Sequence, residues 1–198
     1  MTKAIPMQID IVSDVVCPWC IIGYKNLEDA ISRLDGEIDV TLRWHPFELN
    51  RDMPPEGQDL SEHISEKYGL TADQSADNRA RITMMGENVG FPIHFGSDAR
   101  IYNTFDAHRL LYWAGKEGEY GQQTALKLNL FAAYFQGGDN TADHGVLKRA
   151  VSVRYLPMWS MANSPFPAAT RQKYSNRPFR KSRVRVMKSL PKRKTTPD

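Results

Sequence analysis

The chain has 198 residues, of which 41% are hydrophobic and 10% aromatic, enough for one domain, or one domain with an insertion, around a buried core. No apolar run approaches the roughly 20 residues that a membrane-spanning helix needs, so we expect no membrane insertion. The first ten residues contain no long apolar segment of the kind that begins a secreted protein. We therefore expect a cytoplasmic location, in a reducing compartment.

The net charge of +3 hides a change of composition near residue 150. Residues 1–150 contain 14 basic and 22 acidic residues, a net charge of −8. Residues 151–198 contain 12 basic residues, a single acid (Asp198) and six of the twelve prolines. The composition of residues 161–198 is typical of a segment without a packed core. The two parts of the chain therefore need separate interpretations.

The first 50 residues predict a strand, a helix and a second strand. Residues 7–16 form a short segment rich in β-branched side chains, as strands are. A helix is predicted to begin at Pro18 and to stop at Gly36, because proline suits a first helical position and glycine a helix end. Its apolar face is predicted at helical spacing, and residues 38–44 then alternate like a strand; the predicted face is Leu27, Ala30, Ile31 and Leu34. A helix between two such strands predicts a parallel crossover.

The only two cysteines, Cys17 and Cys20, stand at the junction of the first strand and this helix, in the order Cys17-Pro18-Trp19-Cys20. A C-x-x-C pair near such a unit in a cytosolic chain indicates thioredoxin-like redox chemistry. The positive end of the helix favours a thiolate, so we expect a lowered pKa for Cys17 and assign it the attack. Cys20, one turn further along and predicted to be more buried, resolves the mixed disulfide. Trp19 would shield the pair or offer a flat surface to a peptide.

Two other interpretations of the cysteines are open at this stage. They could be a buried structural pair, or half of a zinc site. Zinc would need two further Cys or His ligands at suitable spacing, and the five histidines are scattered singly. They are His45, His63, His94, His108 and His144. We therefore expect no metal.

Residues 60–149 are predicted to be helical. Thr71 and Gln74 resemble a capping box, which would open a helix that runs to about Val89. Asn103 is a candidate cap for another helix. The predicted helices are 61–68, 72–89, 104–115, 122–136 and one that begins at 139 and continues to 149. We expect these helices to form one wall of a groove over Cys17.

The segment around the cysteines (IDIVSDVVCPWCIIGYKNLEDAI), together with RWHPFELNRDMPPEG and KLNLFAAYFQGGDNTADHGVL, resembles the DsbA-like thiol–disulfide oxidoreductases of the FrnE type. These are relatives of the 2-hydroxychromene-2-carboxylate isomerases and the kappa-class glutathione transferases. The resemblance extends to about Leu147. It implies an α/β, thioredoxin-like fold with an inserted all-helical domain, and Cys17 and Cys20 as the redox pair. The related isomerases and transferases usually lack the first cysteine, which favours redox chemistry here.

On this basis we expect three parts: a thioredoxin-like βαβ unit (1–57), an inserted helical domain (58–149) and an atypical basic, proline-rich segment (150–198). The family would place two more strands, a last helix and a cis proline in the third part. Pro157 is the nearest candidate, but its surroundings do not match. The sheet-completing part is therefore predicted to be missing or altered. Either the segment is a basic tail that binds polyanions, or the reading frame changed near residue 150, which we favour.

Five further residues have ordinary structural interpretations that we prefer to functional ones. Asp14 could relay a proton, but a solvated carboxylate at the end of a strand is the expectation. We expect His45 and His108 in the core or at its rim. The pair Met84-Met85 is expected in the core rather than on a peptide-binding surface.

The sequence thus predicts an enzyme that exchanges a disulfide between Cys17/Cys20 and protein or small-molecule thiols. No organic cofactor or metal is expected, although glutathione is a candidate reductant. The alternatives are a glutathione-dependent isomerase or transferase of the same fold, or an inactive truncated relative with a polyanion-binding tail. Nucleic acid is expected as a partner only through that tail, and the sequence does not define the oligomeric state.

Overall fold

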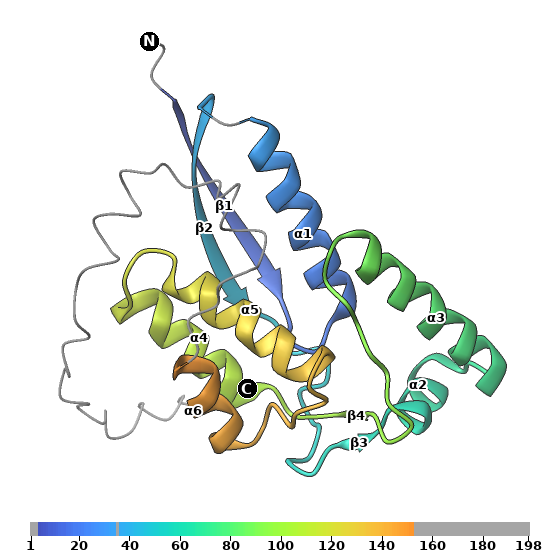
Figure 1. Cartoon of the computed structure of the whole chain (residues 1–198). Coiled ribbons are helices and arrows are strands. Elements are labelled where there is room, and N and C mark those ends of the chain that lie inside the picture. Colours follow the sequence, from blue (N-terminus) through green and yellow to red (C-terminus); the bar gives the residue numbers. More distant parts are fainter. Residues whose placement is uncertain (1–3, 35, 153–198) are drawn as a thin grey trace, which may run out of the picture. The chain divides into compact units, whose positions relative to one another are not determined.

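The computed structural model describes residues 4–34 and 36–152 (Figure 1). The predictions made for the third part of the chain, including Pro157, lie outside these residues except at 150–152. Ten elements follow one another: β1 (Ile5–Ser13), α1 (Pro18–Arg33), β2 (Ile38–Pro46), β3 (Gln58–Asp59), α2 (Leu60–Tyr68), α3 (Ala72–Asn88), β4 (Arg100–Ile101), α4 (Phe105–Glu117), α5 (Gln122–Phe135) and α6 (His144–Ser152).

The first three elements form the predicted strand–helix–strand unit. β1 and β2 pair in parallel over their whole length, from Ile5 opposite Ile38 to Ser13 opposite Pro46. β1 ends three residues earlier than predicted, because Asp14, Val15 and Val16 leave the strand and enter the core. This turn carries the chain to the first residue of α1, so the end of β1 determines where the cysteines lie (Figure 1).

Aromatic side chains join this unit to the helices that follow. The Trp44 ring on β2 lies 5.2 Å from Tyr24 of α1 and 6.4 Å from Phe131 of α5, measured between centroids. The Trp44 indole N–H donates to Thr124 Oγ1 of α5 at 2.9 Å, which satisfies its one polar group. α4 and α5 both contact β2, and α5 shares a hydrophobic core cluster with it. The buried residues of this core cluster are Ile21, Ile22, Tyr24, Trp44, Ile82, Phe91, Ile93, Leu128, Phe131 and Phe135.

The buried side of α1 differs from the prediction. Ile21, Ile22 and Tyr24 in its first two turns are buried, whereas the predicted apolar face further along is half-buried or exposed. Leu34 is 41% exposed. The described helices cover the start of α1, next to the cysteines, more fully than its end. The start of α1 is thus the better anchored end.

The helical part matches the prediction in its elements and several of its ends. Thr71 caps α3, with its hydroxyl accepting from the Gln74 N–H and the Gln74 side chain accepting from the Thr71 N–H, so the capping box is confirmed. Asn103 Oδ1 accepts from the Phe105 N–H at the start of α4, although Thr104 is the capping residue. α6 begins at His144 rather than at 139. The short antiparallel pair β3–β4 was not predicted.

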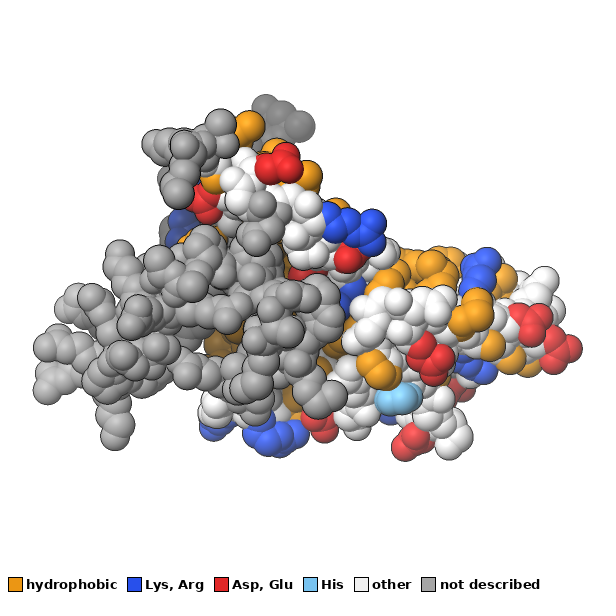
Figure 2. All heavy atoms as spheres, turned by 45° about the horizontal axis from the view of Figure 1, so that its top comes forward, with side chains coloured by type: hydrophobic (Ala, Val, Ile, Leu, Met, Phe, Trp, Pro, Cys, Tyr) orange, Lys and Arg blue, Asp and Glu red, His pale blue; other side chains and the backbone are white. Residues whose placement is uncertain are grey.

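The described surface mixes charged and apolar side chains. On the face shown in Figure 2, acidic and basic side chains are interspersed with hydrophobic ones. Met84 is 55% exposed, so its predicted place in the core is wrong; Met85 is half-buried and packs on the core. Within the part of the chain that the structure describes, no helix is both long and apolar enough to cross a membrane.

Candidate active site

The two cysteines lie at the start of α1. Cys17 precedes the helix with an extended backbone (φ −93°, ψ 111°), and Pro18 occupies the first turn. Cys20 follows in that turn, where its N–H donates to the Cys17 carbonyl oxygen at 3.2 Å. Both are half-buried and carry free thiols. The predicted position at a helix start is therefore confirmed, but Cys20 is only half-buried, as Cys17 is.

The two thiols ionise as a pair. The Cys17 thiol donates a hydrogen bond to Cys20 Sγ, and chiefly for this reason the pKa of Cys20 is lowered to about 6, against the opposing effect of burial. The Ser13 hydroxyl, the Asp14 N–H and the positive charge of Lys127 also favour the Cys20 thiolate. The reduced pair thus holds one negative charge and one shared proton.

The lowered pKa predicted for Cys17 does not apply while Cys17 holds the proton that the two thiols share. The pKa of Cys17 is raised, first because its proton is held in the hydrogen bond to Cys20 and second because the thiol is partly buried. The backbone N–H groups of Trp19 and Cys20 do favour a Cys17 thiolate, as a helix start should, but they are outweighed. The adjacent thiolate is thus a stronger influence than the helix.

We expect the thiolate absorbance of the reduced protein to titrate with a midpoint near pH 6 and to account for one thiolate per chain. In a Cys17→Ala variant the donor to Cys20 is gone, so the Cys20 midpoint should move to higher pH. Ultraviolet absorbance measured against pH tests both. A wild-type midpoint near the free-cysteine value of about 8.5 would contradict the shared hydrogen bond.

Trp19 and Pro18 stand between the cysteines and differ in exposure. Trp19 is 45% exposed, and Pro18 is half-buried. The indole therefore presents much of its surface to solvent beside the thiols, where it could contact a peptide. This position fits the predicted flat surface better than a shield over the sulfurs.

Asp14, three residues before Cys17, is only 1% exposed, so the expectation of a solvated carboxylate is wrong. Its Oδ1 accepts from the Val15 N–H at 2.7 Å, and its Oδ2 accepts from the Leu49 N–H at 2.7 Å. His108 Nε2 of α4 lies 3.2 Å from Oδ1. Burial opposes ionisation of Asp14, but His108 and the Leu49 N–H outweigh it, and the pKa of Asp14 is lowered. His108 is in the core, as predicted, and its partner is this carboxylate.

Lys127 of α5 is a residue near the cysteines that sequence analysis did not identify. It is 1% exposed, and its Nζ donates to the Ser13 carbonyl oxygen at 3.3 Å. Nζ also lies 5.4 Å from the Trp44 ring centroid and 4.9 Å from that of Phe131. Lysine is almost never fully buried unless it is paired. Its position three and four residues before the buried Leu130 and Phe131 is a helical spacing that could have indicated this burial.

The other histidines lie apart from the cysteines. His45 on β2 is exposed, so its expected place in the core or at its rim is wrong, and it lies 2.8 Å from Asp10 Oδ1. His144 lies 2.9 Å from Asp106 Oδ2. His63 Nδ1 is 2.9 Å from Gln58 Oε1. Among residues 4–34 and 36–152, no group of three or more His, Cys, Asp or Glu side chains could hold a metal ion.

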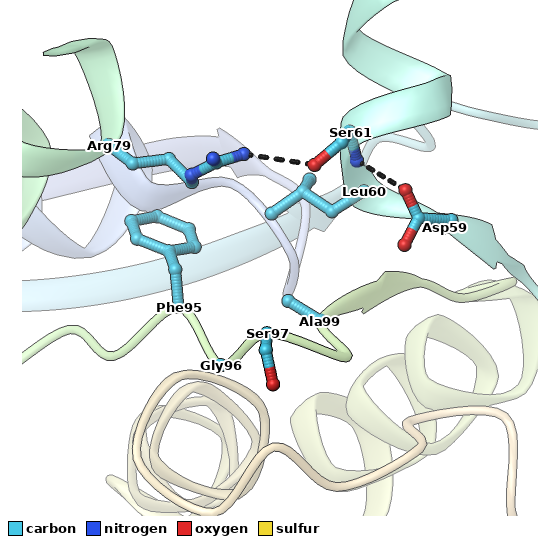
Figure 3. A pocket seen from close by; sticks show the side chains of 8 residues that line it. All are labelled: Asp59, Leu60, Ser61, Arg79, Phe95, Gly96, Ser97 and Ala99. Carbon is cyan, nitrogen blue, oxygen red and sulfur yellow. Dashed lines mark hydrogen bonds between the residues drawn. The ribbon is translucent and has the colours of Figure 1, made fainter. Parts of the chain in front are cut away.

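A cavity of about 170 Å³ lies elsewhere, around the short β3–β4 pair. Arg79 of α3 reaches into it and donates to Ser61 Oγ at 3.2 Å, while Asp59 accepts from the Ser61 N–H (Figure 3). The remaining lining residues are Leu60, Phe95, Gly96, Ser97 and Ala99. Neither cysteine lines this cavity, so it is not the groove predicted over Cys17.

Comparison with known proteins assigns the chain to a family. The model of the DSBA-like thioredoxin domain matches residues 8–153, and the chain belongs to this family. The DsbA-like resemblance and the thioredoxin-like α/β fold predicted from the sequence are thereby confirmed, and the fold is of the thiol–disulfide oxidoreductase type.

Two similar proteins illustrate the relationship. The uncharacterized protein YwbO of Bacillus subtilis (strain 168) is 27% identical over 143 residues, which are 72% of this chain and 64% of YwbO. The crystal structure of the probable DsbA oxidoreductase SCO1869 from Streptomyces coelicolor superposes with a TM-score of 0.65 at 24% identity, covering 74% of this chain and 63% of that one. The chain thus spans somewhat less than two thirds of the length of each.

Proposed function

We propose that the protein is a thiol–disulfide oxidoreductase whose redox pair is Cys17 and Cys20. The observation that carries the proposal is the position of the two half-buried free thiols in one turn at the start of α1, and the lowered pKa of Cys20 supports it. A thiolate at neutral pH is what disulfide exchange requires. The DSBA-like family supports the same chemistry.

The exchange takes place in two steps. Cys17, directly before the first turn of α1, attacks one sulfur of a substrate disulfide while its proton passes to Cys20, and one substrate thiolate leaves. Cys20 gives this proton to the departing first substrate sulfur, attacks Cys17 Sγ as a thiolate, closes the Cys17–Cys20 disulfide and releases the second substrate thiolate, which takes its proton from solvent. Two electrons pass from the dithiol to the substrate, whose two sulfurs take up protons. The reverse sequence oxidises a substrate dithiol.

The chemistry of the site suggests the partners. Protein or small-molecule thiols and disulfides are the proposed substrates, with Trp19 as a contact for peptide substrates. We propose that the reaction needs no organic cofactor or metal, with glutathione as a reductant, and that it takes place in the cytoplasm. The glutathione-dependent isomerase or transferase and the polyanion-binding tail remain alternatives. Retention on immobilised glutathione, or salt-sensitive binding to nucleic acid, would support them respectively.

Turnover of a protein disulfide tests the proposal directly. The full chain should accelerate the reduction of insulin by dithiothreitol, and alkylation of both thiols beforehand should abolish the acceleration. No acceleration by the unmodified, folded protein would refute the proposed function.

A further inference from the structure

Lys127 is a buried cation in a position that costs free energy unless a negative charge compensates it. Its ammonium group reaches the Ser13 carbonyl oxygen and the faces of Trp44 and Phe131, which are neutral groups. Among residues 4–34 and 36–152, no carboxylate lies within ion-pair distance of Lys127 Nζ. Its charge must therefore be balanced over a longer distance.

The charged groups that act on Lys127 are Asp14, Cys20 and Cys17. The oxygens of Asp14 are engaged by the Val15 and Leu49 N–H groups and by His108 of α4. On the other sides, β2 contributes the Trp44 ring and α6 packs on α5 through apolar residues such as Leu147. The thiolate of the reduced cysteine pair is thus the second negative charge available to Lys127.

We propose that Lys127 is the redox-linked cation of the protein: its buried ammonium stabilises the thiolate of the reduced Cys17–Cys20 pair and loses that partner when the disulfide closes. Lys127 acts through the cysteines, as a positioning residue, and the inference rests on the proposed function. In this role Lys127 of α5 couples the thiol–disulfide exchange to pH.

The proton balance follows from the charges. Reduced protein holds one thiolate, one thiol and one ammonium; closing the disulfide leaves two substrate sulfurs that each need a proton. The Cys17–Cys20 pair supplies one proton and the Lys127 ammonium can supply the other through solvent. When Lys127 gives up its proton, the site carries no net charge before or after the exchange, apart from the charge of Asp14.

The expected direction of the Lys127 shift can be worked out from its surroundings. Burial lowers the pKa of Lys127 to about 8 in the reduced protein, while Asp14 and the cysteines oppose this effect. Removal of the thiolate removes one opposing charge, so the pKa of Lys127 should fall further in the disulfide form.

Nuclear magnetic resonance of the full chain, with lysine labelled at Cε, measures this shift. The Lys127 signal, assigned by its absence from Lys127→Arg, is followed against pH in the reduced and the oxidised protein. Its midpoint should be lower in the oxidised protein than in the reduced protein. If the cysteines cycle reversibly but the two Lys127 midpoints coincide, the inference fails and the function stands. If no disulfide forms, both fail.

A pair of variants tests the same coupling from the side of the cysteines. In Lys127→Met the thiolate loses its cation, so alkylation by iodoacetamide should be slower at neutral pH, about twofold if the pKa of the thiolate rises by one unit and about tenfold if it rises by two, and should reach the wild-type rate at alkaline pH. Lys148→Met is the matched control and should react as the wild type does. A wild-type pH profile in folded Lys127→Met would overturn the proposal. If Lys127→Met does not fold, the Lys127 titration in the wild-type protein decides the question.

Discussion

A Cys20→Ser variant should remain covalently joined to its substrate through Cys17, because the sulfur that would release the substrate is gone. Cys17→Ser should form no such adduct, and the insulin reduction rate of both variants should fall to the rate without protein. Non-reducing electrophoresis followed by mass spectrometry of the adduct measures the trapping. The wild type, incubated in the same way, is the control and should show only a transient adduct.

This pair of variants also tests the assignment of roles. The lower pKa belongs to Cys20 in the reduced protein, whereas the proposal assigns the attack to Cys17 on the basis of its position before the helix. The shared hydrogen bond allows the negative charge to move to Cys17 as the attack proceeds. Adducts that accumulate on Cys17→Ser and not on Cys20→Ser would reverse the assignment.

Replacement of Asp14 by asparagine should lower the free energy of unfolding by about 3–5 kcal/mol, as removal of one member of a buried charge group typically does. The asparagine amide has one acceptor oxygen and no charge, so it cannot accept hydrogen bonds from both the Val15 and the Leu49 N–H. Lys127 also loses a compensating charge. Urea denaturation measures the loss. Asp106→Asn is the matched control, because that half-buried carboxylate pairs with Arg109 near the surface and such pairs contribute about 1 kcal/mol or less.

The same carboxylate predicts a pH dependence of stability. The pKa of Asp14 is lowered from its ordinary value of 3.8, so its contribution is complete above that pH and disappears as the pH falls through the lower, folded-state pKa. Stability of the wild type should therefore fall more steeply in acid than that of Asp14→Asn. The structural role of Asp14 would be contradicted if the wild type and Asp14→Asn lost stability in parallel in acid. A decrease in the free energy of unfolding below about 1 kcal/mol for Asp14→Asn at neutral pH would also contradict it.

The elements with strong local signals were predictable from the sequence. Pro18 after Cys17 indicated the start of α1, and Thr71 with Gln74 indicated the start of α3. The short pair β3–β4 was not predictable, because two residues show no periodicity and the partner strands lie far apart in the chain. α1 was predicted as a helix, but its buried side depends on contacts with later helices that spacing within α1 does not reveal.

The chemistry of the candidate site was predictable only in part. The spacing of Cys17 and Cys20 identified the redox pair, but their pKa order depends on a hydrogen bond between the two side chains. Asp14 and Lys127 belong to residue types that are usually exposed. Asp14 contacts His108 of α4, and Lys127 of α5 contacts the strands β1 and β2. Tertiary packing thus determines the electrostatics around a pair that local sequence identifies.

The measurement that tests the account most directly is a redox titration of the full chain in glutathione buffers, with thiols counted by alkylation and mass spectrometry. The account predicts that Cys17 and Cys20 convert together between dithiol and disulfide in one reversible two-electron step. Two thiols that stay alkylatable in the most oxidising buffer, or that each form a separate mixed disulfide with glutathione, would contradict it.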